Sequence, residues 1–524
     1  MRRAVRRTLA GGILLLWLVM VGWQVRREYF QPEVARLTEA ALSLAPGVNF
    51  YTLRMGGRAV GLATSRLDTL PDGFVLEDLL TLELPALGQT GNAVMRTRVE
   101  LSPALVMETF AFALDSEVGR YEASGTVEGD TLLRVELVTG GSRQTSTHRL
   151  VEPPVFAPVL PIRLAVGEGL EVGERLRFPV FDPSSLSTRT VEVRVAEHDT
   201  LLVPDSVEME PGTGRWVPAT YDTVPSWRIA EAYGGVQVES WIDEDGRIVE
   251  ASSPLGFSME RTEYELARQA QEEARGLAGS ALDEDIILST AIQSDVELGD
   301  VQRYEELRFV LSGVELEGFQ LQGGRQALRG DTLIVRQEEW GRLSPGYDLP
   351  YPRMDLREHL QPEPLIQSDD ERIIHTARRM AGRGRGWNQD PVRAARRLTQ
   401  GVNRMLDKDI TFSVPSAVQV LESRAGDCNE HTVLYVALAR ALGLPARTAV
   451  GLVYVNDAFF YHAWPEVWLG EWVAVDPTFG QYPADAAHLR FVVGGLAQQV
   501  EIVRLIGNLQ IEVVGSVLAG VQES

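Results

Sequence analysis

Length, composition and charge exclude several classes of protein. The chain has 524 residues, of which 44% are hydrophobic, so it can form several globular domains with ordinary cores. Its formal net charge of −23 argues against a nucleic-acid-binding surface, and we expect no nucleic-acid partner. It contains a single cysteine, so no disulfide framework can hold its fold together.

Residues 1–29 have the pattern of a signal anchor. Arginines precede an apolar run from Leu9 to Val25, and Arg26 and Arg27 follow it. A cleavable signal peptide has a similar pattern, but no small-residue cleavage site follows the run, so we favour a single-pass transmembrane helix. Because more arginines precede the run than follow it, the bulk of the chain is expected outside the cell membrane, in a periplasm or equivalent space. A single unpaired cysteine is consistent with that compartment.

The chain between the anchor and residue 365 carries no recognisable catalytic pattern. Residues 30–47 are predicted to form a helical stalk, and short alternating runs with regular turn signals predict a β-rich region over 48–255. The Pro-rich stretch 152–161 suggests two β units within it, which we interpret as a scaffold or recognition module. Residues 256–365 are expected to contain a linker helix over 259–277, a β unit and a Pro/Gly-rich linker.

The C-terminal region, 366–524, contains the candidate nucleophile. Gly426 and Asp427 precede Cys428, and the segment from Asn429 to Leu442 has the apolar spacing of a helix. Cys428 is therefore expected at a helix N-terminus, where free N–H groups and the helix dipole lower the pKa of a thiol from its usual ~8.5. A thiolate there can attack an acyl carbon, and its own backbone N–H can help to hold the oxyanion.

His462 and Asp476 complete the set of residue types that a thiolate mechanism needs, namely a base and a group that orients it. They lie on two predicted adjacent strands joined near Gly470. A two-residue loop would place them on opposite faces, whereas a three-residue loop pairs Trp468 with Trp472 and brings both to one face. If these residues form a triad, the hairpin must therefore have an odd loop or a bulge.

Three ordered blocks of this region resemble the transglutaminase-like superfamily of papain-type cysteine enzymes. The matching residues are Ser416-Ala417 with Arg424-Ala425-Gly426-Asp427-Cys428, Arg440-Ala441-Leu442-Gly443-Leu444-Pro445-Ala446-Arg447, His462-Ala463-Trp464-Pro465-Glu466-Val467, and Trp472 with Asp476-Pro477-Thr478. The resemblance covers about 368–494. It implies a papain-like α+β core in which Cys428 is the nucleophile, His462 the base and Asp476 the orienting residue. Trp387 is a candidate second oxyanion donor, because a tryptophan upstream of the nucleophile has this role in cross-linking members of the superfamily.

The resemblance leaves two classes of function open. The first is a membrane-anchored, extracytoplasmic cysteine hydrolase or acyltransferase that acts on amide bonds of proteins or peptides. The second is a binding or assembly protein whose transglutaminase-like domain is a docking platform. A zinc site built from Cys428, His431, His462 and His488 is the rival chemistry, but one cysteine with scattered histidines is a poor zinc set, and we expect no metal and no cofactor.

Overall fold

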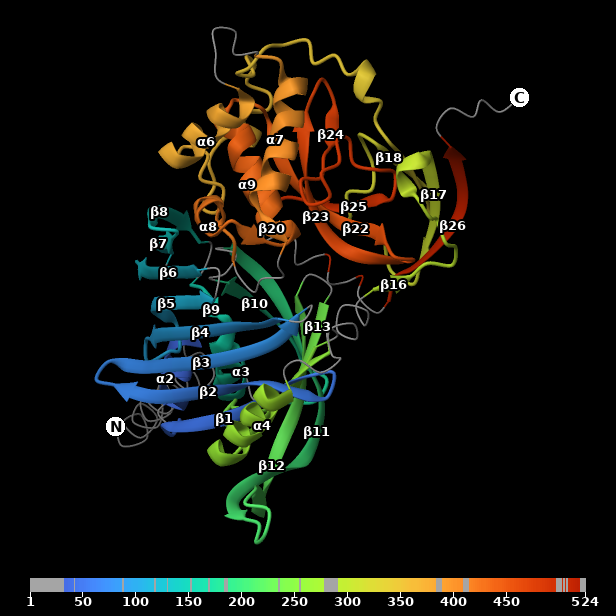
Figure 1. The fold of residues 1–524 in the computed structure, drawn as a ribbon. Helices are drawn as coiled ribbons and strands as arrows, with labels where there is room; N and C mark the ends of the chain where they lie inside the picture. The colour runs from blue at the N-terminus through green and yellow to red at the C-terminus, as the bar shows by residue number, and fades with distance from the viewer. Residues whose placement is uncertain are drawn as a thin grey trace, which may run out of the picture.

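Strands predominate in this protein, and its longer helices gather mainly in the C-terminal region (Figure 1). The computed structural model describes residues 33–41, 43–86, 89–116, 119–129, 131–150, 153–167, 170–182, 187–233, 236–253, 256–277, 291–382, 389–408, 414–495, 502, 505 and 508–518. The expected transmembrane segment, 1–29, lies outside these residues. Among the helices within them, none is both long enough and apolar enough to cross a bilayer. The expected mixture of a β-rich region with an α+β C-terminal region is confirmed at this level.

The N-terminal part of the chain forms a 15-stranded sheet. Its strand order is β8-β7-β6-β5-β4-β3-β2-β1-β15-β14-β13-β12-β11-β10-β9. The strands are β1 (Gly47–Met55), β2 (Arg58–Leu70), β3 (Gly73–Ala86), β4 (Gln89–Leu101), β5 (Met107–Ser116), β6 (Gly119–Glu128), β7 (Leu132–Thr139), β8 (Ser142–Arg149), β9 (Val155–Phe156), β10 (Arg175–Asp182), β11 (Ser187–Met209), β12 (Trp216–Tyr233), β13 (Val236–Ile242), β14 (Ile248–Ser252) and β15 (Phe257–Thr262). Neighbours are antiparallel, except that β9 and β10 are parallel.

This sheet curls, because its two edge strands are consecutive in sequence. β8 ends at Arg149 and β9 begins at Val155, and an extended chain over that interval spans at most roughly 20 Å. Side chains from α2 (Glu33–Ala41) and α3 (Leu160–Gly167) join one core with the strands on the inner side of the curl. The Pro-rich stretch 152–161, predicted as a boundary between two β units, therefore contains β9, one edge strand of this sheet.

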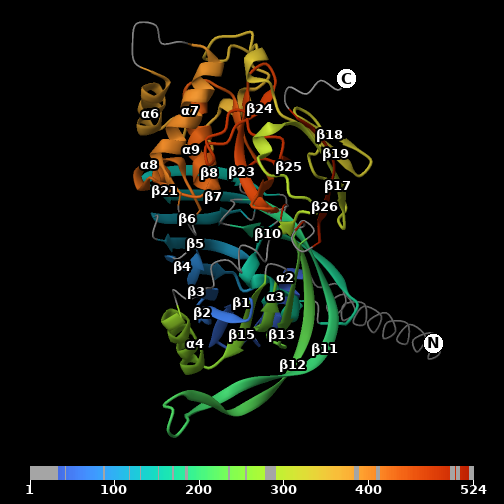
Figure 2. The same ribbon diagram turned by 45° about the vertical axis from the view of Figure 1, so that its right-hand side comes forward.

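A long hairpin and one helix complete the N-terminal part. β11 and β12 extend well beyond the rest of the sheet (Figure 2). Helix α4 (Tyr264–Leu277) packs on β1, β2 and β12, and Gln271 Nε2 donates to Thr81 Oγ1 at 3.1 Å. We predicted a helix from residue 259, but residues 259–262 belong to β15, where they pair with β1 and β14.

The C-terminal part combines two sheets with a group of helices. One sheet has the order β16-β23-β22-β25, with β24 paired to β23, and the other has the order β18-β19-β17-β26. The strands are β16 (Ile292–Gln293), β17 (Tyr304–Ser312), β18 (Gln326–Arg329), β19 (Thr332–Arg336), β22 (Ala446–Val455), β23 (Ala458–Trp468), β24 (Trp472–Ala474), β25 (His488–Val493) and β26 (Gln510–Leu518), and β20 (Asp407–Lys408) pairs with β21 (Ala425–Gly426) apart from them. The helices are α6 (Glu371–Ala381), α7 (Pro391–Met405), α8 (Ala417–Ser423) and α9 (Cys428–Ala441), with single 3-10 turns η1 (Ala157–Val159), η2 (Val301–Arg303), η3 (Trp340–Arg342) and η4 (Arg357–Leu360) elsewhere.

Helix α9 lies at the centre of this part of the fold. Most of its side chains are buried, and α6, α7, α8, β22 and β23 pack around it. A helix enclosed in this way has a fixed axis, so the residue at its N-terminus is held firmly. β26 pairs with β17 and does not join the sheet of β22 and β23.

The two parts of the chain meet beside the segment that leads to α9. The hydroxyl of Thr139, at the end of β7, lies 2.9 Å from both Ser416 Oγ and Gln419 Oε1. Ser416 is the N-cap of α8, and all three side chains are buried. Arg372 Nη1, from α6, also donates to the Gly140 carbonyl at 3.3 Å. The large sheet therefore supports α8, and this helix ends only a few residues before Cys428.

Candidate active site

Cys428 is the first residue of α9, as the sequence predicts. Asp427 caps the helix by accepting from the Asn429 N–H at 2.8 Å, and the Glu430 carboxylate accepts from the Asp427 N–H at 3.0 Å. This reciprocal pair is a capping box, and it fixes the first turn. Gly426 is required beside it, because a Cβ at that position would lie 2.3 Å from Glu430 Cβ.

Cys428 is half-buried as a residue, and its thiol lies against β23. The backbone N–H of Ala463 donates to it, which favours the thiolate. Burial nevertheless raises the pKa of the Cys428 thiol well above its usual value, and the nearby carboxylates of Asp427, Glu430 and Asp476 raise it further. We expected the helix N-terminus to give a lowered thiol pKa, but burial and the surrounding negative charge raise it instead.

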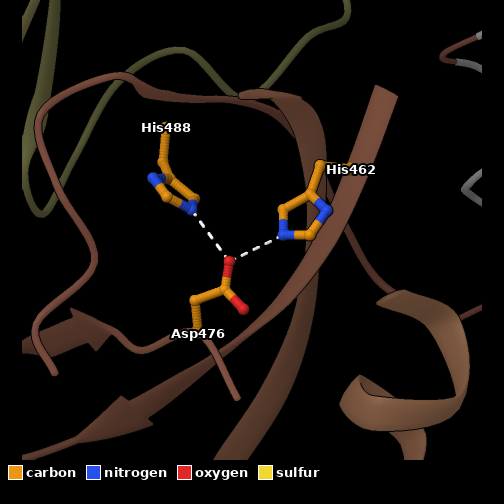
Figure 3. Close-up of side chains that lie close together, drawn as sticks. All are labelled: His462, Asp476 and His488. Atoms are coloured by element: carbon orange, nitrogen blue, oxygen red, sulfur yellow. Dashed lines mark hydrogen bonds and ion pairs between the residues drawn. The ribbon is translucent and has the colours of Figure 1, made fainter. Parts of the chain in front are cut away.

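His462 and Asp476 form a buried hydrogen-bonded pair (Figure 3). His462 Nε2 lies 2.7 Å from Asp476 Oδ2, and the two side chains are 5% and 0% exposed. The other oxygen, Oδ1, accepts from the Thr478 and Phe479 N–H groups at 2.7 and 3.0 Å. Burial alone would raise the pKa of Asp476, but His462 and His488 outweigh it and hold that pKa well below its usual value. Asp476 is therefore a carboxylate with both oxygens in use.

The hairpin that carries the pair has the predicted register. Trp468 pairs with Trp472, and Leu469 N–H donates to the Glu471 carbonyl within the loop. This confirms the three-residue loop, the alternative that places His462 and Asp476 on one face. β24 ends before Asp476. The Asp476 N–H donates to the Gln481 carbonyl, and the Asp476 carbonyl accepts from the Gln481 N–H.

Aromatic rings and an asparagine fix the position of this pair. Trp464 and Phe479 stack on the His462 ring, with centroid distances of 6.0 and 5.0 Å. Asn403 Nδ2, on α7, donates to the Pro477 and Thr478 carbonyls at 2.9 and 3.0 Å, and so holds the turn that carries Asp476. The sequence offers no signal for Asn403, because its partners come from a turn more than 70 residues later in the chain.

His488, which the sequence analysis weighed only as a zinc ligand, is a direct neighbour of this pair. Its Nε2 lies 3.0 Å from Asp476 Oδ2, the same oxygen that contacts His462 (Figure 3), and its Nδ1 lies 2.8 Å from Asp485 Oδ1. Burial would lower the pKa of His488, but Asp485 and Asp476 outweigh it and raise the pKa to about 9. His488 is therefore an imidazolium at neutral pH, enclosed by two carboxylates.

The four residues weighed as a zinc set do not come together as one. His462, Asp476 and His488 lie close enough to share an ion, but their contacts of 2.7 and 3.0 Å have ordinary hydrogen-bond lengths and satisfy these atoms. His431 Nδ1 instead lies 2.7 Å from the Asp427 carbonyl, in the first turn of α9. Trp387, the candidate second oxyanion donor, lies outside the residues that the structure describes.

Comparison with known families finds a match to the region that contains this site. Residues 378–477 match the model of the transglutaminase-like superfamily. The C-terminal domain is transglutaminase-like. The matched range includes α9, β22, β23 and β24, and so contains Cys428, His462 and Asp476. A comparison with curated proteins finds no match to the chain.

Several solved structures match part of this chain. A proposed cysteine protease from Cytophaga hutchinsonii is 15% identical to this chain, and the match has a TM-score of 0.26. It covers 43% of this chain and 89% of the protease chain. A β-barrel-like protein of a domain family of unknown function from Brucella abortus is 15% identical, with 42% and 95% covered and a TM-score of 0.30. The periplasmic domain of TgpA from Pseudomonas aeruginosa, bound to ethylmercury, is 19% identical, with 36% and 76% covered and a TM-score of 0.24. Because these TM-scores are low, the description of the fold is based on the helices and strands given above and not on these matches.

Proposed function

We propose that the transglutaminase-like domain is a cysteine hydrolase or acyltransferase that acts on amide bonds of proteins or peptides. In this proposal Cys428 is the nucleophile, His462 the base and Asp476 the orienting residue. The observation that carries it is the buried His462–Asp476 hydrogen bond, 2.7 Å long, next to the Ala463 N–H that contacts the thiol. No cofactor or metal is part of the proposed chemistry.

The geometry supports a defined order of proton transfers. Asp476 binds His462 through Nε2, which leaves Nδ1 as the nitrogen that can accept the thiol proton. Because the pKa of the Cys428 thiol is raised, we propose that this proton moves to His462 as Sγ attacks the amide carbon, not before. The Cys428 N–H, at the start of α9, stabilises the oxyanion.

Collapse of the tetrahedral intermediate breaks the carbon–nitrogen bond, and the proton on His462 passes to the leaving amine. The product on the enzyme is a thioester of Cys428. Water then releases a carboxylic acid, or a second amine releases a new amide. His462 takes a proton from the attacking water or amine, and passes it to the Cys428 sulfur as the carbon–sulfur bond breaks. The two outcomes differ only in which acceptor reaches the thioester.

The location of the domain is also a proposal from the sequence. We propose that residues 1–29 anchor the chain in the cell membrane and that the domains proposed over 48–255, 256–365 and 366–524 lie on the extracytoplasmic side. The acidic, single-cysteine composition is compatible with that side. Deleting residues 1–29 should release a soluble protein from membranes, and a truncated chain that still sediments with membranes would contradict this topology.

Turnover can be tested without knowing the natural substrate. The full-length protein is incubated with a peptide mixture and a labelled primary amine, and mass spectrometry detects new carboxyl groups from hydrolysis or amine adducts from transfer. We expect products with the wild type and none with Cys428→Ala or Cys428→Ser, because a serine hydroxyl does not replace the thiol in this site. Product formation by both variants would overturn the enzyme proposal and favour a docking role for the domain.

A further inference from the structure

Asp476 serves two histidines, and this arrangement goes beyond what a three-residue mechanism needs. His462 and His488 both reach Oδ2, at 2.7 and 3.0 Å, and come from β23 and β25 respectively. The centroids of the two imidazole rings are 5.7 Å apart. Since both rings contact Oδ2, each ring weakens the hydrogen bond and the electrostatic attraction between this oxygen and the other ring.

His488 is itself held by a dedicated set of contacts. Asp485 Oδ1 binds its Nδ1 at 2.8 Å and also accepts from the Ala487 N–H at 3.0 Å. Gln481 Nε2 donates to the other oxygen of Asp485 at 2.8 Å. Asp485 and His488 are 1% and 0% exposed, so neither side chain can exchange these partners for water. A histidine that only filled space would not require a buried carboxylate on its far side.

The other charged groups around His488 do not oppose its positive charge. On the β23 side, His462 is the titratable neighbour, and Trp464 contributes an uncharged ring with its centroid 5.2 Å away. Behind Asp485, Arg325 Nη2 donates to the Ala484 and Asp485 carbonyls, at 2.9 and 2.7 Å. Glu338 lies 3.6 Å from Arg325 and balances its charge.

We infer that His488, held by Asp485, is a positioning residue of the proposed triad that fixes Asp476 toward His462 and competes with His462 for the charge of Oδ2. The inference rests on the proposed function of Cys428, His462 and Asp476. Its consequence is that His462 gives up its proton more readily than a histidine with the aspartate to itself. That property suits a base that must return its proton to a leaving amine in each cycle.

The test is the titration of His462 in the full-length protein. The chain has seven histidines, so a sample with 13C-labelled histidine gives few Cε1 resonances, and His462→Asn identifies the one of interest. In His488→Gln the amide nitrogen stands the same number of bonds from the backbone as His488 Nε2, so it keeps the donor and removes the charge. Coulomb's law over 5.7 Å with an effective dielectric constant of about 20 predicts that the His462 midpoint moves up by about two pH units.

A second variant and the wild type keep the test decisive. His488→Gln leaves Asp485 unpaired, so the double variant His488→Gln/Asp485→Asn removes both charges, and we expect a smaller shift in the same direction. In the wild type, the His462 resonance should show a second inflection near the pH at which His488 loses its proton, about 9. An unmoved midpoint in the folded variants, or no second inflection, would mean that His488 only fills the core. This readout needs neither substrate nor thiol, so its failure would leave the proposed role of Cys428 standing.

Discussion

Replacement of Asp476 by asparagine is the sharpest test of the proposed triad. The carboxylate accepts from two imidazole nitrogens at Oδ2 and from two backbone N–H groups at Oδ1. An asparagine amide has one acceptor and one donor, so either orientation turns its NH2 group toward two N–H donors. If the amide nitrogen faces His462, that ring must move its own proton to Nδ1, and Nδ1 can then no longer accept the proton of the thiol.

The size of the effect follows from the contact distance. A full charge at 2.7 Å with an effective dielectric constant of about 20 contributes about 6 kcal/mol to the ion pair between Asp476 and a protonated His462. His488 shares the same oxygen, so the net loss is smaller. We therefore expect Asp476→Asn to reduce turnover by about 10²- to 10⁴-fold, and the rate of Cys428 alkylation at neutral pH by about tenfold or more.

Iodoacetamide alkylation is a direct assay, because Cys428 is the only cysteine in the chain. Rates are measured by mass spectrometry across the pH range for the wild type, Asp476→Asn and a control, Asp331→Asn, which changes an exposed carboxylate in the turn before β19. Asp485→Asn is unsuitable as a control, because Asp485 contacts His488 and through it Asp476. Identical pH profiles for the wild type and Asp476→Asn would refute the reasoning and reduce the site to Cys428 and His462.

Three further predictions concern the stability of the same region. Glu466→Gln leaves the buried Arg490 and the half-buried Arg447 without their carboxylate, and should lower the free energy of unfolding, measured in urea, by about 3–5 kcal/mol. Glu422→Gln, at an exposed pair, should cost under about 1 kcal/mol, and equal losses would contradict this reasoning. The raised pKa of His488, about 9, contributes about 3 kcal/mol to the free energy of unfolding. This contribution is complete below pH 6.5 and is lost as the pH rises through 9, so the stability of His488→Gln should depend less on pH than that of the wild type. Gly426→Ala forces a Cβ against Glu430 and should destabilise the chain by about 1–3 kcal/mol while slowing Cys428 alkylation; unchanged stability would show that the loop can shift.

Local features of the chain could be predicted from the sequence because their causes are local. The apolar spacing after Asn429 and the Gly426-Asp427 pair place a helix start at Cys428, and the structure begins α9 there. Asp390 and Pro391 likewise mark the start of α7, where the Asp390 side chain accepts from the Val392 N–H. The hairpin around Gly470 could be reduced to two registers, and the requirement that two side chains meet selected the correct one.

Features that depend on residues far apart in the chain could not be predicted in this way. The β-rich character of 48–255 was expected, but its closure into a curled sheet depends on β8 and β9 lying at opposite edges, which strand periodicity does not encode. The pKa of the Cys428 thiol also depends on residues that are distant in the chain. The helix start argues for a lowered pKa of the thiol, whereas the packed neighbours of Cys428 raise it.

The sequence by itself determined which residues are available for chemistry, since the types and order of Cys428, His462 and Asp476 are properties of the chain alone. Only the tertiary structure decided how those residues are held. His488 and Asp485 have no motif of their own, and they gain their significance when β25 lies beside β22 and brings an imidazole within 3.0 Å of Asp476. The physical reason is that a hydrogen bond or an ion pair acts over a few ångströms, and the fold alone sets which distant residues come that close.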